Sequence, residues 1–394
     1  MNAFDPTFLD DPGSTGLSLD PAFAELAATV ARPFHEARTM PASVYTSEAF
    51  LAREQERIFR RDWIAVGRAS SLDKPGDYIA YDLAGEPVMV IRDHDGQLRA
   101  QSNVCRHRMS TLLEGRGHVE RITCPYHGWV YNLDGRLRGA PHMESNSAFD
   151  RREICLPEIR CEEWMGWVLI SLNPDAPPMG TGLESLEAEI EPFGLADYHE
   201  AFHETFVWDT NWKVLAENFM ESYHLPVCHG ATIGGLSDIA ASDLPPGEPA
   251  FNLHSIMKDP SFTLSVAHPT NTRLTGDLRL KTYLMTVYPS LLITLSPGYF
   301  WYLSLHPRGV GQVHVTYGGG LAPEFLADPA SAAHFADLKA LLAEVNQEDK
   351  GCTERVYRGL QAGLAEPGPL SPMERPQNDF TQYIAGRLDW PPPP

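Results

Sequence analysis

Two short segments combine cysteine with histidine at a spacing suited to an iron–sulfur cluster. NVCRHRM contains Cys105-x-His107, TCPYHGW contains Cys124-x-x-His127, and sixteen residues separate the two pairs. Two thiolates and two imidazoles are the ligands of a Rieske-type [2Fe–2S] centre, in which histidines replace the cysteines on one iron and raise the reduction potential. A Cys₂His₂ zinc site uses the same ligand types, but its usual spacing places both cysteines in one pair. The mixed pairs therefore favour the [2Fe–2S] cluster.

A second group of metal-binding residue types follows about a hundred residues later. Glu221-x-x-His224 predicts a carboxylate and an imidazole one turn apart on the same face of a helix. Pro226 is expected to end that helix, which lets His229 approach His224 from the next turn. Two imidazoles and one carboxylate form the facial triad of Fe(II) oxygenases, which leaves positions open for O₂. Two histidines that are simply hydrogen-bonded in the fold are the alternative, but the upstream cluster would supply the electrons that such an iron site consumes.

Taken together, these runs resemble the α subunit of the Rieske non-haem iron oxygenases. The resemblance is carried by CRHR, CPYHGW and NWKVLAENFMESYHLPVCH, and it extends from about residue 45 to 385. It implies a [2Fe–2S] cluster held by Cys105, His107, Cys124 and His127, and a mononuclear Fe(II) held by His224 and His229.

The third iron ligand is implied by the same resemblance. VNQEDKGCTERV is similar to the late acidic motif of the family and implies Asp349, with Glu348 as the neighbouring alternative. Glu221 matches the acidic residue that bridges the Rieske domain of one subunit to the mononuclear iron of the next. Glutamate at this position resembles the branch that oxidises carnitine and related quaternary ammonium compounds, whereas many ring-dihydroxylating members have aspartate. Glu221 could also be an ordinary hydrogen-bond partner of His224, and Asn218, one turn earlier, could face the iron.

The resemblance implies an oxygenase component that activates O₂ as cosubstrate with electrons from NAD(P)H. A separate reductase of the flavin/iron–sulfur type would deliver the electrons, and the substrate would be a small organic molecule that is hydroxylated or demethylated. A homotrimer is implied as well. Two other interpretations stay open: an aromatic ring-dihydroxylating dioxygenase α subunit, and a Rieske electron carrier without catalysis.

Aromatic strand residues offer a candidate substrate pocket. Alternate side chains of a strand face the same side, so some of these residues must point inward. Their faces would attract a trimethylammonium group, although a flat aromatic acid would also fit, and strand aromatics are common in ordinary cores. The candidates are Tyr283, Tyr288, Tyr299, Phe300, Trp301 and Tyr302.

The elements that must position these groups suggest an α+β protein. Ser47 is expected to cap a helix that runs to about residue 63, and short strands separated by turns at DHDG and NLDG follow to residue 173. Beyond the Pro/Gly-rich joint at 173–182, we expect a strand at 203–214, a helix at 215–224, four strands within 281–319 and a long helix at about 328–364.

These elements divide into three parts. Residues 1–45 are expected to form an arm, 46–173 an antiparallel β Rieske domain with a leading helix, and 174–394 the catalytic domain. The catalytic domain should have an antiparallel sheet covered by helices, of the helix-grip type.

Charge and hydropathy exclude several classes of partner. Thirty-one Lys and Arg against 52 Asp and Glu give a net charge of −21, which repels nucleic acid and anionic lipid surfaces. The longest uncharged stretch, 282–307, is interrupted by prolines and glycine and does not predict a membrane span. The start of the chain lacks the basic and apolar segments of a secretory signal. A cytoplasmic protein that binds a small molecule is therefore expected.

Overall fold

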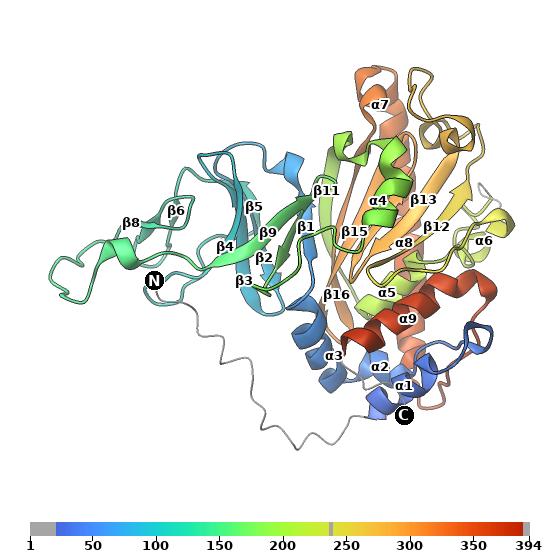
Figure 1. The fold of residues 1–394 in the computed structure, drawn as a ribbon, viewed down its shortest axis with the longest axis horizontal. Coiled ribbons are helices and arrows are strands. Elements are labelled where there is room, and N and C mark those ends of the chain that lie inside the picture. Colours follow the sequence, from blue (N-terminus) through green and yellow to red (C-terminus); the bar gives the residue numbers. More distant parts are fainter. Residues whose placement is uncertain (1–20, 236–238, 389–394) are drawn as a thin grey trace. The chain divides into compact units, whose positions relative to one another are not determined.

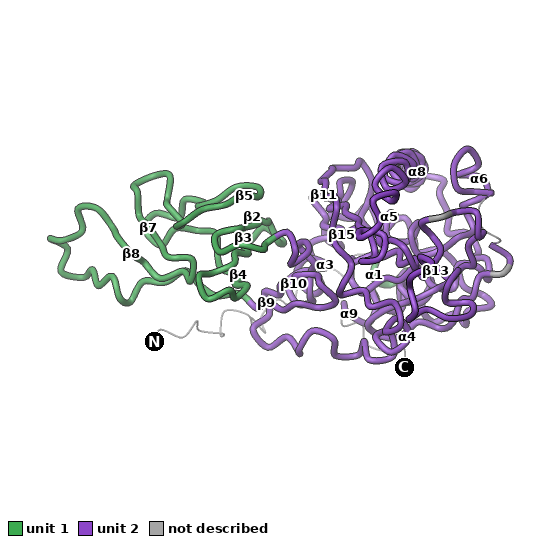
Figure 2. Tube along the Cα trace, turned by 90° about the horizontal axis from the view of Figure 1, so that it is seen from above, with its two compact units in different colours: residues 1–25, 72–159 green, residues 26–71, 160–394 purple. Residues whose placement is uncertain are grey.

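The computed structural model describes residues 21–235 and 239–388, and these residues form two compact units. One unit comprises residues 21–25 and 72–159, and the other comprises residues 26–71 and 160–388 (Figure 2). Residues 1–20 of the expected arm lie outside the described residues. The later part of that arm contains the helix α1 (Pro21–Val30) and the start of α2 (Ala42–Thr46).

The first unit is built from antiparallel strands and two loops that carry the Cys/His pairs. Neighbouring strands follow the order β5 (Arg116–His118), β2 (Asp77–Leu83), β3 (Glu86–Arg92), β4 (Leu98–Ser102). A second small sheet contains β6 (Ile122–Thr123), β7 (Val130–Tyr131) and β8 (Leu137–Gly139) (Figure 1). The expected turns at DHDG and NLDG are confirmed, because Gly96 donates to the Asp93 carbonyl and Gly135 to the Asn132 carbonyl.

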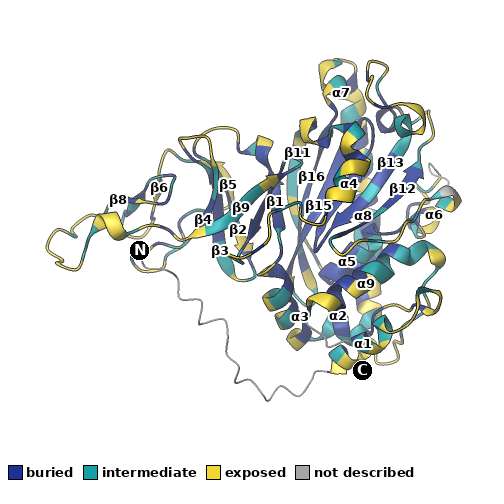
Figure 3. Ribbon diagram, viewed as in Figure 1, coloured by how far each residue is buried: buried dark blue, intermediate teal, exposed yellow. Residues whose placement is uncertain are grey.

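The second unit contains an antiparallel sheet, as the sequence predicts, but it has six strands and not the five expected, because β12 (Phe251–Met257) was not predicted. Its strand order is β11 (His199–Trp208), β16 (Gln312–Leu321), β15 (Tyr299–Gly309), β14 (Leu291–Leu295), β13 (Lys281–Val287), β12. Figure 3 shows that its central strands are buried almost throughout. The α+β class with helices on an antiparallel sheet is therefore confirmed.

Helices cover one side of this sheet and a strand pair packs against another part of it. Helix α5 (Trp212–Phe219) contacts β15, α9 (Arg375–Arg387) contacts β12, and the long α8 (Ser331–Leu360) packs on α5. The strands β1 (Ile64–Arg68) and β10 (Trp167–Ser171) pair with each other, and β9 (Glu158–Trp164) extends this pair. The other α-helices of the described chain are α3 (Glu48–Glu54), α4 (Glu184–Ile190), α6 (Leu225–Cys228) and α7 (Pro323–Ala327).

Residues 46–71 belong to the second unit and not to the β unit that follows them in the sequence. Ser47 caps α3 as predicted, accepting a hydrogen bond from Phe50 N at 3.1 Å. Glu54 at the end of this helix forms a fully buried ion pair with Lys213 of α5 at 2.8 Å. Trp212 Nε1 donates to the other oxygen of Glu54 at 3.1 Å. These long-range contacts attach the leading helix to α5 of the second unit.

The chain between β11 and α6 differs from the expectation in two ways. The strand ends at Trp208, and Asn211 caps a helix from Trp212, its side chain accepting from Lys213 N. This helix ends at Phe219, so Glu221 and His224 are not on one helix face. Pro226 lies in the first turn of α6 and does not end a helix, because the first turn needs no proline N–H. In the described part of the chain, none of the helices has the length and apolar character needed to cross a bilayer.

Candidate metal centres

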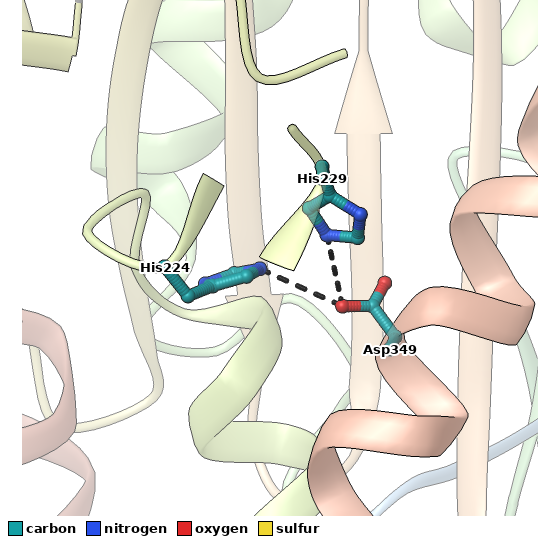
Figure 4. Close-up of side chains that lie close together, drawn as sticks. All are labelled: His224, His229 and Asp349. Atoms are coloured by element: carbon teal, nitrogen blue, oxygen red, sulfur yellow. Dashed lines mark ion pairs between the residues drawn. The ribbon is translucent and has the colours of Figure 1, made fainter. Parts of the chain in front are cut away.

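Three of the predicted ligands meet at one point in the second unit. His224, His229 and Asp349 each offer a ligand atom within 4.8 Å of the others (Figure 4). Asp349 Oδ1 lies 3.0 Å from Nε2 of His229 and 3.5 Å from Nε2 of His224. The histidines flank the short helix α6, and Asp349 comes from α8. Both Nε2 atoms thus face a single carboxylate, which is the donor set of a two-histidine, one-carboxylate iron site.

Glu348, the alternative third ligand, faces a different atom. Its Oε2 lies 2.7 Å from Nδ1 of His229 and accepts a hydrogen bond from Thr232 Oγ1 at 2.6 Å. Successive helix residues point about 100° apart, so Asp349 is directed to the Nε2 side. Asn218 also reaches this side, since its Nδ2 donates to Asp349 Oδ1 at 2.8 Å. A carboxylate on Nδ1 fixes the orientation of a metal-binding imidazole and leaves Nε2 available.

Glu221 holds His224 in the same manner, from a turn and not from a helix. Its Oε1 lies 2.6 Å from Nδ1 of His224. Its Oε2 accepts hydrogen bonds from the backbone N–H groups of Tyr223 and His224. The structure therefore brings Glu221 together with His224, and the bridge to a second subunit stays a prediction.

The electrostatics of the site follow from this close packing. Burial disfavours the charge on His224, but hydrogen bonds with Asp349 and Glu221 outweigh it and raise the pKa to about 10. Burial likewise opposes the charge on Asp349, and the two imidazoles outweigh it and lower the pKa of the carboxyl to about 2. The site is thus a strongly coupled cluster of opposite charges, in which a bound metal would take the place of imidazole protons.

The two Cys/His pairs also meet, in the first unit. Cys105 and Cys124 are buried, and the rings of His107 and His127 lie 4.6 Å apart between centroids. Nδ1 of His107 is buried and has no hydrogen-bond partner among the described residues. These two thiols and two imidazoles, including the unpartnered ring nitrogen of His107, fit the ligand set of a Rieske cluster.

Neighbouring residues support the cysteines. Tyr131 Oη lies 3.3 Å from Cys105 Sγ. Burial opposes ionisation of Cys124, but hydrogen bonds from the backbone N–H groups of Tyr126 and His127 outweigh it, and the pKa of the thiol is lowered. These donors stabilise a thiolate, which is the form that binds metal.

A cavity with about 790 Å³ of free space, counted out to its solvent-open mouth, adjoins the histidine–aspartate group. Two of the six candidate aromatics, Tyr299 and Trp301, line it. Phe300 and Tyr302 point to the opposite side of β15 and pack edge-on against Trp167. This is the alternation expected of a strand.

The comparisons with known families match both units. Residues 62–159 match the Rieske [2Fe–2S] domain, and residues 195–390 match the catalytic domain of the ring-hydroxylating α subunit. The chain belongs to the Rieske non-haem iron oxygenase α subunits. The family resemblance of the sequence motifs is thereby confirmed.

Two relatives and one solved structure illustrate what this Rieske oxygenase α subunit is similar to. The carnitine monooxygenase oxygenase subunit of Escherichia coli is 36% identical over 218 residues, which are 54% of this chain and 57% of that protein. The chloroplastic choline monooxygenase of Spinacia oleracea is 27% identical over 368 residues, 90% of this chain and 80% of that one. The structure of a quaternary ammonium Rieske monooxygenase superposes with a TM-score of 0.80 at 25% identity, covering 92% of this chain and 98% of the other.

Sequence reasoning missed some contributors to the sites of this family member. Trp208, Phe219 and Phe262 line the cavity, and Tyr131 contacts the cluster cysteine. Phe219 directly follows Asn218, which the sequence analysis placed near the iron. Its position next to Asn218 could therefore have indicated that Phe219 lies near the site. Tyr131 had none, because its contact to Cys105 depends on the pairing of β6 with β7.

Proposed function

We propose that the protein is the oxygenase component of a Rieske monooxygenase that hydroxylates or demethylates a quaternary ammonium compound. The observation that carries this proposal is the convergence of His224, His229 and Asp349 at the wall of the cavity. Fe(II) bound there would supply O₂ activation, and a [2Fe–2S] cluster on Cys105, Cys124, His107 and His127 would supply electrons.

The chain's own residues have separable roles in this proposal. Glu221 and Glu348 hold the imidazoles so that both Nε2 atoms face the metal position. Asn218 positions the Asp349 carboxylate. The cavity walls bind substrate and limit access of water, which protects the reaction from side chemistry.

Two observations favour a quaternary ammonium substrate over an aromatic ring. The relatives described above are named for carnitine and choline oxidation. The cavity also has indole and phenyl faces, which attract trimethylammonium groups. The histidine–aspartate group disfavours the pure electron carrier, which would need no such site.

The partners are also proposals. We infer a separate flavin/iron–sulfur reductase that draws on NAD(P)H, a homotrimer, and a cytoplasmic location. The similar quaternary ammonium monooxygenase is described as transferring electrons between subunits. A bridging role of Glu221 would fit a trimer in which each cluster serves the iron of a neighbour.

O₂ uptake tests the proposal. The purified protein with a surrogate reductase and NADH should consume O₂ in the presence of a betaine. It should release either a hydroxylated product carrying one atom from ¹⁸O₂, or a demethylated amine together with one equivalent of formaldehyde, and the second oxygen atom should leave as water. A cis-diol from an aromatic acid would instead establish the dioxygenase. Uptake with neither class, together with protein free of mononuclear iron, would indicate the electron carrier.

A further inference from the structure

His254 on β12 is a buried histidine close to His224 that does not belong to the group of candidate metal ligands. Two residues later on the same strand, Ile256 lines the cavity that adjoins the metal site. Alternate residues of a strand share a face, so His254 is directed to the side of the sheet that bears this site. Burial and, to a smaller extent, the charge of His224 lower the pKa of His254 to about 3. The ring is therefore uncharged and can lie near a bound cation without repelling it.

The hydrogen-bond partner of His254 is Ser222, which lies between Glu221 and His224 in the turn that follows α5. The Ser222 hydroxyl oxygen is 3.1 Å from Nε2 of His254, and both residues are only 1% exposed. Nδ1 of the same ring is buried and has no hydrogen-bond partner among the described residues. The bond to Ser222 therefore fixes the orientation of the ring, and water does not compete for it. It joins the turn that carries one proposed iron ligand to a strand of the sheet.

The turn at 220–224 needs a fixed attachment because it is not part of a helix. Helix α5 ends at Phe219, and α6 begins only at Leu225. Within the turn, Glu221 accepts a hydrogen bond from the backbone N–H of His224 at 3.1 Å and contacts Nδ1 of its ring at 2.6 Å. These contacts orient the imidazole relative to the turn, but they do not fix the turn relative to the sheet. The hydrogen bond between Ser222 and His254 does.

We propose that His254 is a positioning residue of the mononuclear iron site, which sets the place of the turn through Ser222 and so aims Nε2 of His224 at the metal position. This inference rests on the proposed function and deepens it. His254 is not among the residues that line the cavity, so its effect reaches the site through Ser222. Glu221 and His224 are the neighbours of Ser222 in the same turn. A displaced turn would therefore weaken iron binding and disturb the electron path proposed for Glu221 at the same time.

Iron binding by variants at both ends of the hydrogen bond tests this role. The probe is Fe(II), and its dissociation constant is measured by anaerobic chelator competition on full-length protein with the cluster intact. His254→Met and Ser222→Ala should each weaken iron binding about 3- to 10-fold, as expected for the loss of one neutral hydrogen bond. The double variant should lose no more than either single variant, because both remove the same bond. His254→Gln, whose amide can take the place of Nε2, should recover most of the affinity.

Ser296→Ala is the matched control that separates positioning from general stability. Its hydroxyl forms a buried hydrogen bond of 2.7 Å with Thr282, in the same sheet but without a link to the turn. Losing this bond should lower the denaturant midpoint of iron-free protein about as much as Ser222→Ala does. The iron dissociation constant of Ser296→Ala should nevertheless equal that of wild type.

The outcomes separate this inference from the function on which it rests. If His254→Met and Ser222→Ala bind iron as tightly as wild type, or if Ser296→Ala weakens binding equally, His254 does not position the site. If His254→Gln binds iron as weakly as His254→Met, the hydrogen bond is not the cause and the inference fails as well. Asp349→Ala tests the iron site itself: if it keeps iron as wild type does, or if wild type binds none, the proposed function fails and this inference with it. If Asp349→Ala loses iron while the other variants keep it, only the positioning role is wrong.

Discussion

Each imidazole at the metal site is held on Nδ1 by one glutamate, and this leaves both Nε2 atoms facing Asp349. His224 contacts Glu221 at 2.6 Å, and His229 contacts Glu348 at 2.7 Å. In the proposed site the two glutamates would orient the ligands, and Asp349 is the carboxylate that would bind the metal itself. Removing a ligand and removing its orienting partner should have different effects.

Asp349→Ala should lose mononuclear iron and turnover, because one of three ligands is gone. Glu348→Gln should keep the iron site and weaken iron affinity about 10- to 100-fold, the usual effect of losing such an orienting group. Iron content after dialysis against a graded chelator series measures both. Asn346, which lies about one turn before Asp349 on α8 and also lines the cavity, provides a control as Asn346→Ala. Full iron retention by Asp349→Ala would contradict the assignment.

Glu221→Gln should keep the cluster and, when iron is supplied in excess, the mononuclear iron, and should reduce turnover by orders of magnitude if Glu221 links the two redox centres. The amide keeps the size of the side chain but is a weaker acceptor for the imidazole N–H. Rapid mixing of the reduced variant with O₂ and substrate should show cluster reoxidation slowed as much as product formation. Reoxidation at the wild-type rate with loss of product would assign Glu221 to orientation of His224 alone.

The residue types at this site were predictable and their geometry was only partly so. The motif His-x₄-His and the late acidic run identify all three members of the group. Spacing alone does not decide between Asp349 and Glu348, because the choice depends on which side of α8 faces α6. The cavity aromatics Trp208 and Phe262 come from segments without a recognisable signal, since only the fold brings them together.

At the scale of elements, α5 connects the leading helix to the metal site. Its first turn carries Lys213, which pairs with Glu54 of α3, and its last turn carries Asn218, which contacts Asp349. The Ser47 cap could be predicted, because it depends only on residues that are close in the sequence. The attachment of α3 to the second unit was not, because it depends on a pair of residues far apart in the sequence.

Lys213→Met should destabilise the protein by about 3–5 kcal/mol, since it leaves the Glu54 charge buried without its partner. The double variant Glu54→Gln/Lys213→Met should recover part of this loss. Lys339→Met serves as a control, because its pair with Glu204 has both side chains 40% exposed and should contribute about 1 kcal/mol or less. Denaturant unfolding of the four proteins makes the comparison, and equal losses for Lys213→Met and Lys339→Met would contradict it.

Glu217 on α5 should make stability depend on pH. Burial raises the pKa of its carboxyl to about 7, although a hydrogen bond from Tyr45 and the charge of Lys213 oppose the shift. A raised carboxyl pKa contributes stability that is complete below the unfolded pKa of about 4.5 and is lost as pH rises through about 7. The unfolding free energy of wild type relative to Glu217→Gln should therefore fall by up to about 3 kcal/mol across this range. A pH-independent difference between the two proteins would show that Glu217 does not titrate there.

At the scale of the whole molecule, the two sets of candidate ligands lie in separate units. His127→Ala should therefore lose the visible absorption of the [2Fe–2S] cluster and keep the mononuclear iron, because none of the second-unit ligands is changed. His229→Ala should show the reverse. Optical spectra and iron counts on both variants measure this independence, and loss of both centres from either variant would contradict it.

The mononuclear site joins distant parts of the chain, since the contact between Asn218 and Asp349 spans 131 residues. During synthesis, a ribosome-bound chain that ends before α8 has only the two histidines of the site. Two imidazoles alone bind divalent metals weakly and with little selectivity. With Asp349 as the third ligand of the proposed site, iron would be captured in its final geometry only after α8 has folded against α5. Once captured, it cross-links a long loop and so opposes unfolding through chain entropy. Metal loading is thus tied to completion of the domain, and a truncated chain would be released without iron.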